Sequence, residues 1–205
     1  VYMEQGWLDV AERDLRSTTP LLIERVGEDH VDVGSSFYTL GMLAWEQGRL
    51  EEAERHLAQA VAIWRTSSAR TRALGGMAEH AQVLQALGRD AAANTEIDQA
   101  SQQAVVQLGL KHALTAEVEH VHGLMLAARG EHAAAIDRLR RALQISRSAQ
   151  GPDAVRTQDI ELSLAREQAR DENPHAIGTI ERLARQDPAK RDSREPRNLR
   201  WRAQA

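Results

Sequence analysis

Residues 40–60 read LGMLAWEQGRLEEAERHLAQA, and this stretch decides the fold. Its apolar residues recur every three or four positions on both sides of Gly48, which is the spacing of one helix face. Glycine readily adopts the left-handed conformation that ends a helix. The stretch therefore predicts two antiparallel helices joined at Gly48. Small residues at Gly41, Ala53 and Ala60 would let the two helix axes approach closely.

The same pattern returns along the chain. The turn glycines of four copies lie at positions 6, 48, 88 and 130, so the spacings are 42, 40 and 42 residues. A weaker fifth copy begins near Thr157. One helical hairpin does not bury its own apolar face, whereas stacked hairpins bury a continuous core. We therefore expect an all-α solenoid of about four to five antiparallel helix pairs.

At these residues the chain resembles the tetratricopeptide repeat (TPR) family, whose pattern places an aromatic residue, a turn glycine and alanines at fixed offsets. The period of 40 to 42 residues is longer than the usual period of about 34. Linkers such as residues 26–33 take up the extra length and look like the joints of kinesin-light-chain-type repeats, which residues 47–54 (QGRLEEAE) also resemble. The resemblance covers residues 1 to about 165 and implies a right-handed superhelix.

The composition agrees with a helical repeat and excludes several classes of protein. Of 205 residues, 42% are apolar but only 3% are aromatic, and 33 are alanines, which indicates a thin core and nearly excludes a β-sandwich or barrel. Cysteine is absent, so disulfides and thiolate nucleophiles are excluded and we expect a cytoplasmic protein. Apolar runs fall far short of the roughly 18 residues that span a membrane. A net charge of -4 gives no general attraction to nucleic acid.

We expect one helical repeat domain over residues 1–186 and a basic, disordered tail over residues 187–205. Residues 1–6 match the last turn of a first helix, so the first repeat is truncated and the chain is interpreted as a fragment of a longer protein. The apolar side chains of Tyr2, Met3 and Trp7 would then need an upstream neighbour. Pro20 should kink the first long helix or restart it after Thr19.

The last repeat is expected to be degenerate. Its first helix should end at Asn173-Pro174, and a second helix should cover about residues 175–185.

No residue pattern in the chain indicates catalysis or a cofactor. No glycine-rich phosphate loop follows a strand, and no serine lies in the context of a nucleophile elbow. Glu117 and His120 have the three-residue spacing of a carboxylate-bridged metal site, but no matching carboxylates face them, and a solvated helix face is the better interpretation. His80 and His122 are expected to be partly buried imidazoles with one hydrogen bond each, the alternative being a pH-sensitive seam.

The expected functional surface is the concave groove lined by the first helix of each repeat. The helical period and the resemblance place eight side chains there: Tyr38, Met42, Trp45, Gln82, Gln85, His120, Leu124 and Arg166. Tyrosine, methionine and tryptophan supply large contact areas at protein interfaces. For Trp45, an equally good interpretation is that it caps the core of the incomplete first repeat.

The resulting hypothesis is a non-catalytic scaffold that binds a peptide or a partner protein, with no metal, nucleic acid or membrane segment. The asparagine-and-lysine clamp of chaperone-binding relatives is absent, so a carboxylate terminus is not the expected ligand. The alternative is the sensory module of a multidomain bacterial signalling protein, whose kinase or transcription-regulator domain precedes residue 1. A metal enzyme is a third possibility that requires a metal to be found.

Overall fold

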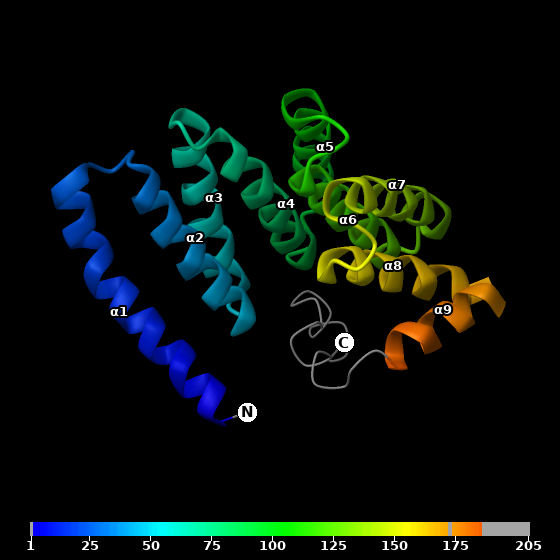
Figure 1. The fold of residues 1–205 in the computed structure, drawn as a ribbon. Helices are drawn as coiled ribbons and strands as arrows, with labels where there is room; N and C mark the ends of the chain where they lie inside the picture. The colour runs from blue at the N-terminus through cyan, green and yellow to red at the C-terminus, as the bar shows by residue number, and fades with distance from the viewer. Residues whose placement is uncertain (1, 172–173, 186–205) are drawn as a thin grey trace. The chain divides into compact units, whose positions relative to one another are not determined.

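The computed structural model describes residues 2–171 and 174–185, and every regular element in that part of the chain is helical (Figure 1). In order they are α1 (Tyr2–Val26), α2 (Val31–Glu46), α3 (Leu50–Thr66), α4 (Arg70–Ala86), α5 (Asp90–Leu108), α6 (Ala113–Ala128), α7 (His132–Gln150), α8 (Val155–Gln168), η1 (Ala169–Asp171, a 3-10 turn) and α9 (Pro174–Arg185). The expected all-α repeat fold is confirmed. Within this part, no helix is both long enough and apolar enough to cross a membrane.

The residues up to Ala100 form one compact unit, and those from Ser101 onward form a second, so α5 contributes to both. The first unit contains α1, the hairpin of α2 and α3, and α4 with the first part of α5. The second unit contains the rest of α5, the hairpin of α6 and α7, and the hairpin of α8 and α9. Figure 1 shows the antiparallel pairing within the α2–α3 and α6–α7 hairpins.

The hairpin turns lie at the glycines that the sequence pattern predicts. Gly48, Gly88 and Gly130 follow α2, α4 and α6, with φ angles of 75°, 72° and 79°. After α2, the amide of Arg49 donates to the carbonyl of Ala44 at 2.8 Å, the long backbone bond that closes a Schellman motif. Glycine is required at these turns because other residues strain in the left-handed region.

The small residues of the repeat bring two helices of a hairpin into close contact. A Cβ atom placed on Gly41 would lie 2.8 Å from Leu57 Cγ and 3.2 Å from the Leu57 backbone nitrogen. The same atom on Gly123 would lie 2.8 Å from Leu139 Cγ and 3.3 Å from the Leu139 nitrogen. Both leucines are fully buried. The seam of the α2–α3 hairpin and that of the α6–α7 hairpin are therefore each a glycine packed directly against a leucine of the facing helix.

Trp64 joins three helices of the first unit, a role that the repeat pattern did not predict. Its indole packs against Gly34 of α2 and Gly76 of α4, where an added Cβ would lie 2.7 Å and 3.1 Å from the ring. The indole Nε1 donates to the carbonyl of Val31 at 3.2 Å. Because Trp64 is only 4% exposed, nearly all of its side chain contacts other residues of the unit.

The first helix departs from two predictions. Helix α1 continues through both Gly6 and Pro20, so the expected turn at Gly6 and the expected restart after Thr19 are wrong. The hydroxyl of Thr18 donates to the carbonyl of Asp14 at 2.8 Å, and the hydroxyl of Thr19 donates to that of Leu15 at 2.6 Å. These bonds tie together the turn that Pro20 weakens by lacking an amide hydrogen.

The last hairpin is largely as expected. Helix α9 (Pro174–Arg185) confirms the predicted second helix, whereas α8 ends at Gln168 and continues as η1 instead of reaching Asn173. The side chains of Tyr2, Met3 and Trp7 and the tail over residues 187–205 lie outside the described residues.

Two glycine-to-alanine substitutions separate the cost of the turn conformation from the effect of adding a methyl group. A Cβ on Gly48 meets nothing within 4 Å, and neither does one on Gly178 inside α9. Gly48→Ala should lower the free energy of unfolding by about 1 kcal/mol, because alanine is strained at a φ of 75°. Gly178→Ala should raise it by up to about 1 kcal/mol, because alanine favours the helix. Urea unfolding followed by circular dichroism measures both, and equal signs would contradict this account of the turn.

Candidate functional site

The predicted binding residues lie on the first helices of the hairpins, in two sets. Helices α2 and α4 of the first unit carry Tyr38, Met42, Trp45, Gln82 and Gln85. Helices α6 and α8 of the second unit carry His120, Leu124 and Arg166.

The apolar members of the first set are mostly core residues. Met42 and Trp45 are each 9% exposed and belong to a buried cluster with Leu57 and Val83. The alternative interpretation of Trp45, as a residue of the core, therefore fits the structure better than an exposed anchor. Tyr38 is half-buried and lies with its ring centre 5.3 Å from that of Trp64. Of the three proposed anchors, Tyr38 alone keeps a substantial part of its side chain exposed.

The polar members of the first set lie on α4. Gln82 is 5% exposed, and its Nε2 has no hydrogen-bond partner within the described residues. A buried amide without a partner costs about 1–3 kcal/mol, so Gln82 would gain from an added acceptor. Gln85, one turn later, is half-buried. Helix α4 also reaches α2 through Arg72, whose NH1 donates to Ser35 Oγ at 3.0 Å.

In the second unit, His120 connects α6 to α8. The Ser163 hydroxyl donates to the carbonyl of Asp159 at 2.9 Å, so its oxygen accepts the bond from His120 Nε2, also at 2.9 Å. Burial, with a smaller contribution from the positive charge of Arg156, lowers the pKa of His120 to about 4. His120 is therefore a neutral hydrogen-bond donor at neutral pH.

The residues beside His120 serve the same contact between helices. Glu117 pairs with Arg156 of α8 at 2.7 Å. Glu117 and His120, three residues apart on α6, therefore both contact α8. No three histidine, aspartate or glutamate side chains within residues 2–171 and 174–185 gather as metal ligands. Leu124 is 8% exposed. Arg166 is exposed and has no carboxylate partner in the part of the chain that the structure describes.

The two histidines His80 and His122 have different surroundings. His80 is 8% exposed, with Nδ1 2.6 Å from Glu96 Oε2 and Nε2 4.0 Å from Glu54 Oε1. His122 is 5% exposed, with Nδ1 3.2 Å from Ser101 Oγ. His80 therefore faces two carboxylates, whereas the sequence predicts one hydrogen bond and no acidic neighbour.

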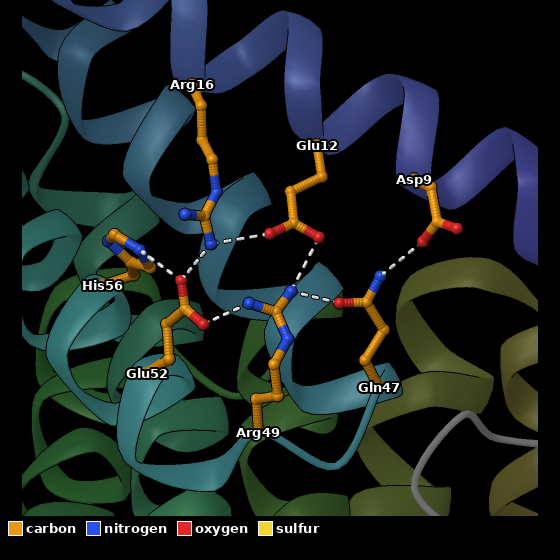
Figure 2. A network of polar contacts seen from close by, with 7 residues as sticks. All are labelled: Asp9, Glu12, Arg16, Gln47, Arg49, Glu52 and His56. Carbon is orange, nitrogen blue, oxygen red and sulfur yellow. Dashed lines mark hydrogen bonds and ion pairs between the residues drawn. The ribbon is translucent and has the colours of Figure 1, made fainter.

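A ring of ion pairs attaches α1 to the first hairpin, and sequence analysis did not identify it (Figure 2). Glu12 lies 2.7 Å from Arg16 and 2.6 Å from Arg49, and both arginines also contact Glu52, which closes the ring. Burial raises the pKa of Glu12, but the hydrogen bonds from Arg49, Gln47 and Arg16 and the charge of Arg49 together outweigh it, so the pKa of this carboxyl is lowered overall. The four-residue spacing of Glu12 and Arg16 and the three-residue spacing of Arg49 and Glu52 are sequence features that could have indicated the ring.

Further polar residues extend the ring along α1 and α3. Gln47 Nε2 donates to Asp9 Oδ1 at 3.2 Å, and Gln47 Oε1 accepts from Arg49. His56 Nε2 lies 3.6 Å from Glu52 Oε1 (Figure 2). These contacts hold α1 in place and leave no free carboxylate in the ring for a ligand.

Comparison with known proteins supports the family resemblance. A family model described as tetratricopeptide repeat matches residues 1–66. No curated protein matches the chain. The match and the structural similarities below confirm the expected resemblance to tetratricopeptide repeats of the kinesin-light-chain type.

Two kinds of solved structure share the fold. BtubC (BKLC) from P. vanneervenii has a TM-score of 0.72 and 17% identity, covering 95% of this chain and 78% of that chain. The nearly identical TPR-like repeats of a candidate kinesin light chain from Podosopora anserina, in a variant form, have a TM-score of 0.68 and 20% identity, covering 89% of this chain and 88% of that chain. A second structure of those repeats has a TM-score of 0.64 and 21% identity over the same shares. At these identities the similarity establishes the fold alone.

The neutral state of His120 makes the second unit sensitive to acid. Its pKa is about 4 in the folded chain and 6.5 in the unfolded chain, so the unfolded state binds the proton more tightly. The neutral imidazole of His120 contributes its full stabilisation above about pH 6.5. As the pH falls toward 4, the free energy of unfolding should decrease by up to about 3 kcal/mol.

His120→Gln is the matched variant, because its amide still donates to Ser163 but does not titrate. Urea unfolding at a series of pH values should show the wild type losing more stability than the variant between pH 6.5 and 4. If the free energies of unfolding of the wild type and the variant fell in parallel with pH, the lowered pKa assigned to His120 would be contradicted.

Proposed function

We propose that this chain is a non-catalytic scaffold that binds a peptide or a partner protein through the first helices of its hairpins. The observation that carries the proposal is the amide of Gln82, which is buried on α4 without a hydrogen-bond partner among the described residues. A backbone carbonyl of a bound peptide would supply the missing acceptor after a rotation of the glutamine amide. Tyr38 and Gln85 are half-buried on the same pair of first helices and would supply further contacts.

The chemistry of the His120–Ser163 pair supports a binding role over a catalytic one. A histidine whose pKa is about 4 is a weak base at neutral pH. The Ser163 proton is directed to the Asp159 carbonyl, and Ser163 is itself 5% exposed. This serine therefore lacks both activation and access to a substrate.

A second, more specific proposal is that the chain acts in the cytoplasm as the sensory part of a bacterial signalling protein. The alanine-rich and arginine-rich composition of the repeats supports it, by analogy with repeats attached to kinases and transcription regulators. The reading frame upstream of residue 1 tests it. An effector domain encoded there would support the proposal, and its absence would exclude it.

The binding proposal is tested with an immobilised library of degenerate peptides. Gln82→Leu should weaken retention about three- to tenfold, the value of one hydrogen bond. Because the variant removes an unpartnered polar group, its free energy of unfolding should stay equal to that of the wild type or exceed it. Opposite effects on binding and on stability would separate a binding role from a structural one.

The control is Gln59→Leu on the exposed face of α3, which should leave retention unchanged. Substitutions at Met42 and Trp45 are unsuitable, because those side chains belong to the core. Equal retention by wild type and Gln82→Leu would contradict the role of Gln82, and a wild type that retains no peptide would contradict the proposed function.

A further inference from the structure

The joint between α3 and α4 carries an unusual concentration of positive charge. Residues 65–72 read RTSSARTR, and residues 55–78 contain no aspartate or glutamate, although the whole chain has 30 of them against 26 lysines and arginines. Arg65 ends α3, and Arg70 and Arg72 lie in the first turn of α4. We call this set, Arg65, Arg70 and Arg72, the arginine corner.

The side chains of the arginine corner are exposed, and none has a carboxylate partner within the described residues. Arg65 NH2 lies 3.2 Å from Met77 Sδ, and Arg72 NH1 donates to Ser35 Oγ at 3.0 Å. One turn before Ser35, the carboxylate of Asp32 lies 3.6 Å from His30 Nδ1. A guanidinium has five donors, so most donors of the corner are available.

Several other arginines of the same unit are paired with carboxylates. Arg16 and Arg49 belong to the ring of ion pairs, and Arg89 lies 3.4 Å from Glu54. Arg65, Arg70 and Arg72 have no such partner among the described residues, and unlike Arg25 and Arg55, which also have none there, they lie close together along the chain.

The backbone at the corner adds to the positive potential. Helix α4 has no acidic residue in its first turn, and no side chain caps its N-terminus. The nearby Ser67 hydroxyl instead accepts from the amide of Ala69 at 3.1 Å. Arginines at the positive end of a helix dipole oppose helix stability, and a bound anion would relieve that repulsion.

We propose that the arginine corner docks a phosphoserine or phosphothreonine of a partner protein. This inference rests on the proposed peptide-binding function, because it names the chemistry of the partner. The three arginines lie within eight residues at the joint between α3 and α4, and this local positive charge suits a compact group of about -1.5 to -2 charge and three acceptor oxygens. Guanidinium groups bind phosphate oxygens through paired hydrogen bonds.

The local composition argues against a nucleic acid at this corner. Single-stranded nucleic acids need aromatic side chains on which the bases stack, and Trp64, the aromatic residue next to Arg65, is only 4% exposed. Three charges at one joint also form a much shorter track than the phosphate-lined groove of such proteins requires.

The test uses three degenerate peptide libraries that differ only at one fixed central residue, which is phosphoserine, serine or glutamate. The wild type should retain the phosphoserine library at least about tenfold better than the other two. Arg70→Gln should reduce that preference several-fold, and Arg70→Gln with Arg72→Gln should abolish it. Retention of the serine library should not change.

The matched control is Arg55→Gln with Arg25→Gln, which removes the same charge from two exposed arginines outside the corner. Circular dichroism verifies that each variant is folded, and the single Arg70→Gln variant keeps the bond from Arg72 to Ser35. The control should keep the preference for phosphoserine.

Each other outcome overturns the inference in a distinct way. Equal retention of the phosphoserine and serine libraries would reject phosphate docking and leave the proposed peptide binding standing. Equal retention of the glutamate library would assign the corner to carboxylates. Tight binding of a single-stranded oligonucleotide with the same dependence on Arg70 would assign it to nucleic acid. Retention of none of the libraries would reject the proposed function itself.

Discussion

The contact on which the structure depends is the packing of a glycine against a leucine across the α2–α3 and α6–α7 hairpins. Gly41 faces Leu57, and Gly123 faces Leu139, at distances that leave no room for a Cβ atom. This contact lets the two helix axes approach closely, so a core made largely of alanine becomes dense. With 3% aromatic residues, the chain has few large side chains to fill a wider gap.

The same shortage of large side chains shapes the functional surface. Trp45, Trp64 and Met42 are buried, because the units need them in their cores. In the proposed function, recognition therefore depends mainly on hydrogen bonds and charge, supplied by the amide of Gln82 and by the arginine corner. A polar surface of this kind favours partners with matching polar groups over partners that offer one apolar anchor.

The sequence predicted the features that follow from local chemistry and from the repeat period. The turns at Gly48, Gly88 and Gly130 and the small residues of the seam all lie where the spacing placed them. Predictions from local sequence were wrong where contacts between residues distant in the sequence determine whether a helix continues. Helix α1 continues through Gly6 and Pro20, because hydroxyl bonds tie the turn before the proline and the ring of ion pairs holds the helix against α3.

The candidate site was less predictable than the fold. A helical period assigns a residue to one face but does not say whether a neighbouring helix covers that face, so Met42 and Trp45 were placed in a groove although they are 9% exposed. The period did place Tyr38 and Gln85, which are half-buried. The sequence did not predict the arginine corner, because the linear order of residues does not show which arginines lack an acidic partner in the folded chain.

The most direct test of the glycine–leucine contact is a double-mutant cycle of Gly123→Ala and Leu139→Ala, measured as free energies of unfolding in urea. In the wild-type background, Gly123→Ala should cost about 2 kcal/mol or more, because its methyl group would lie 2.8 Å from Leu139 Cγ. In the Leu139→Ala background that atom is gone and only the contact of 3.3 Å with the backbone nitrogen of residue 139 remains, so the cost should fall by more than about 1 kcal/mol, which is the coupling energy. An equal cost in both backgrounds would show that the seam is loosely packed and would contradict the account.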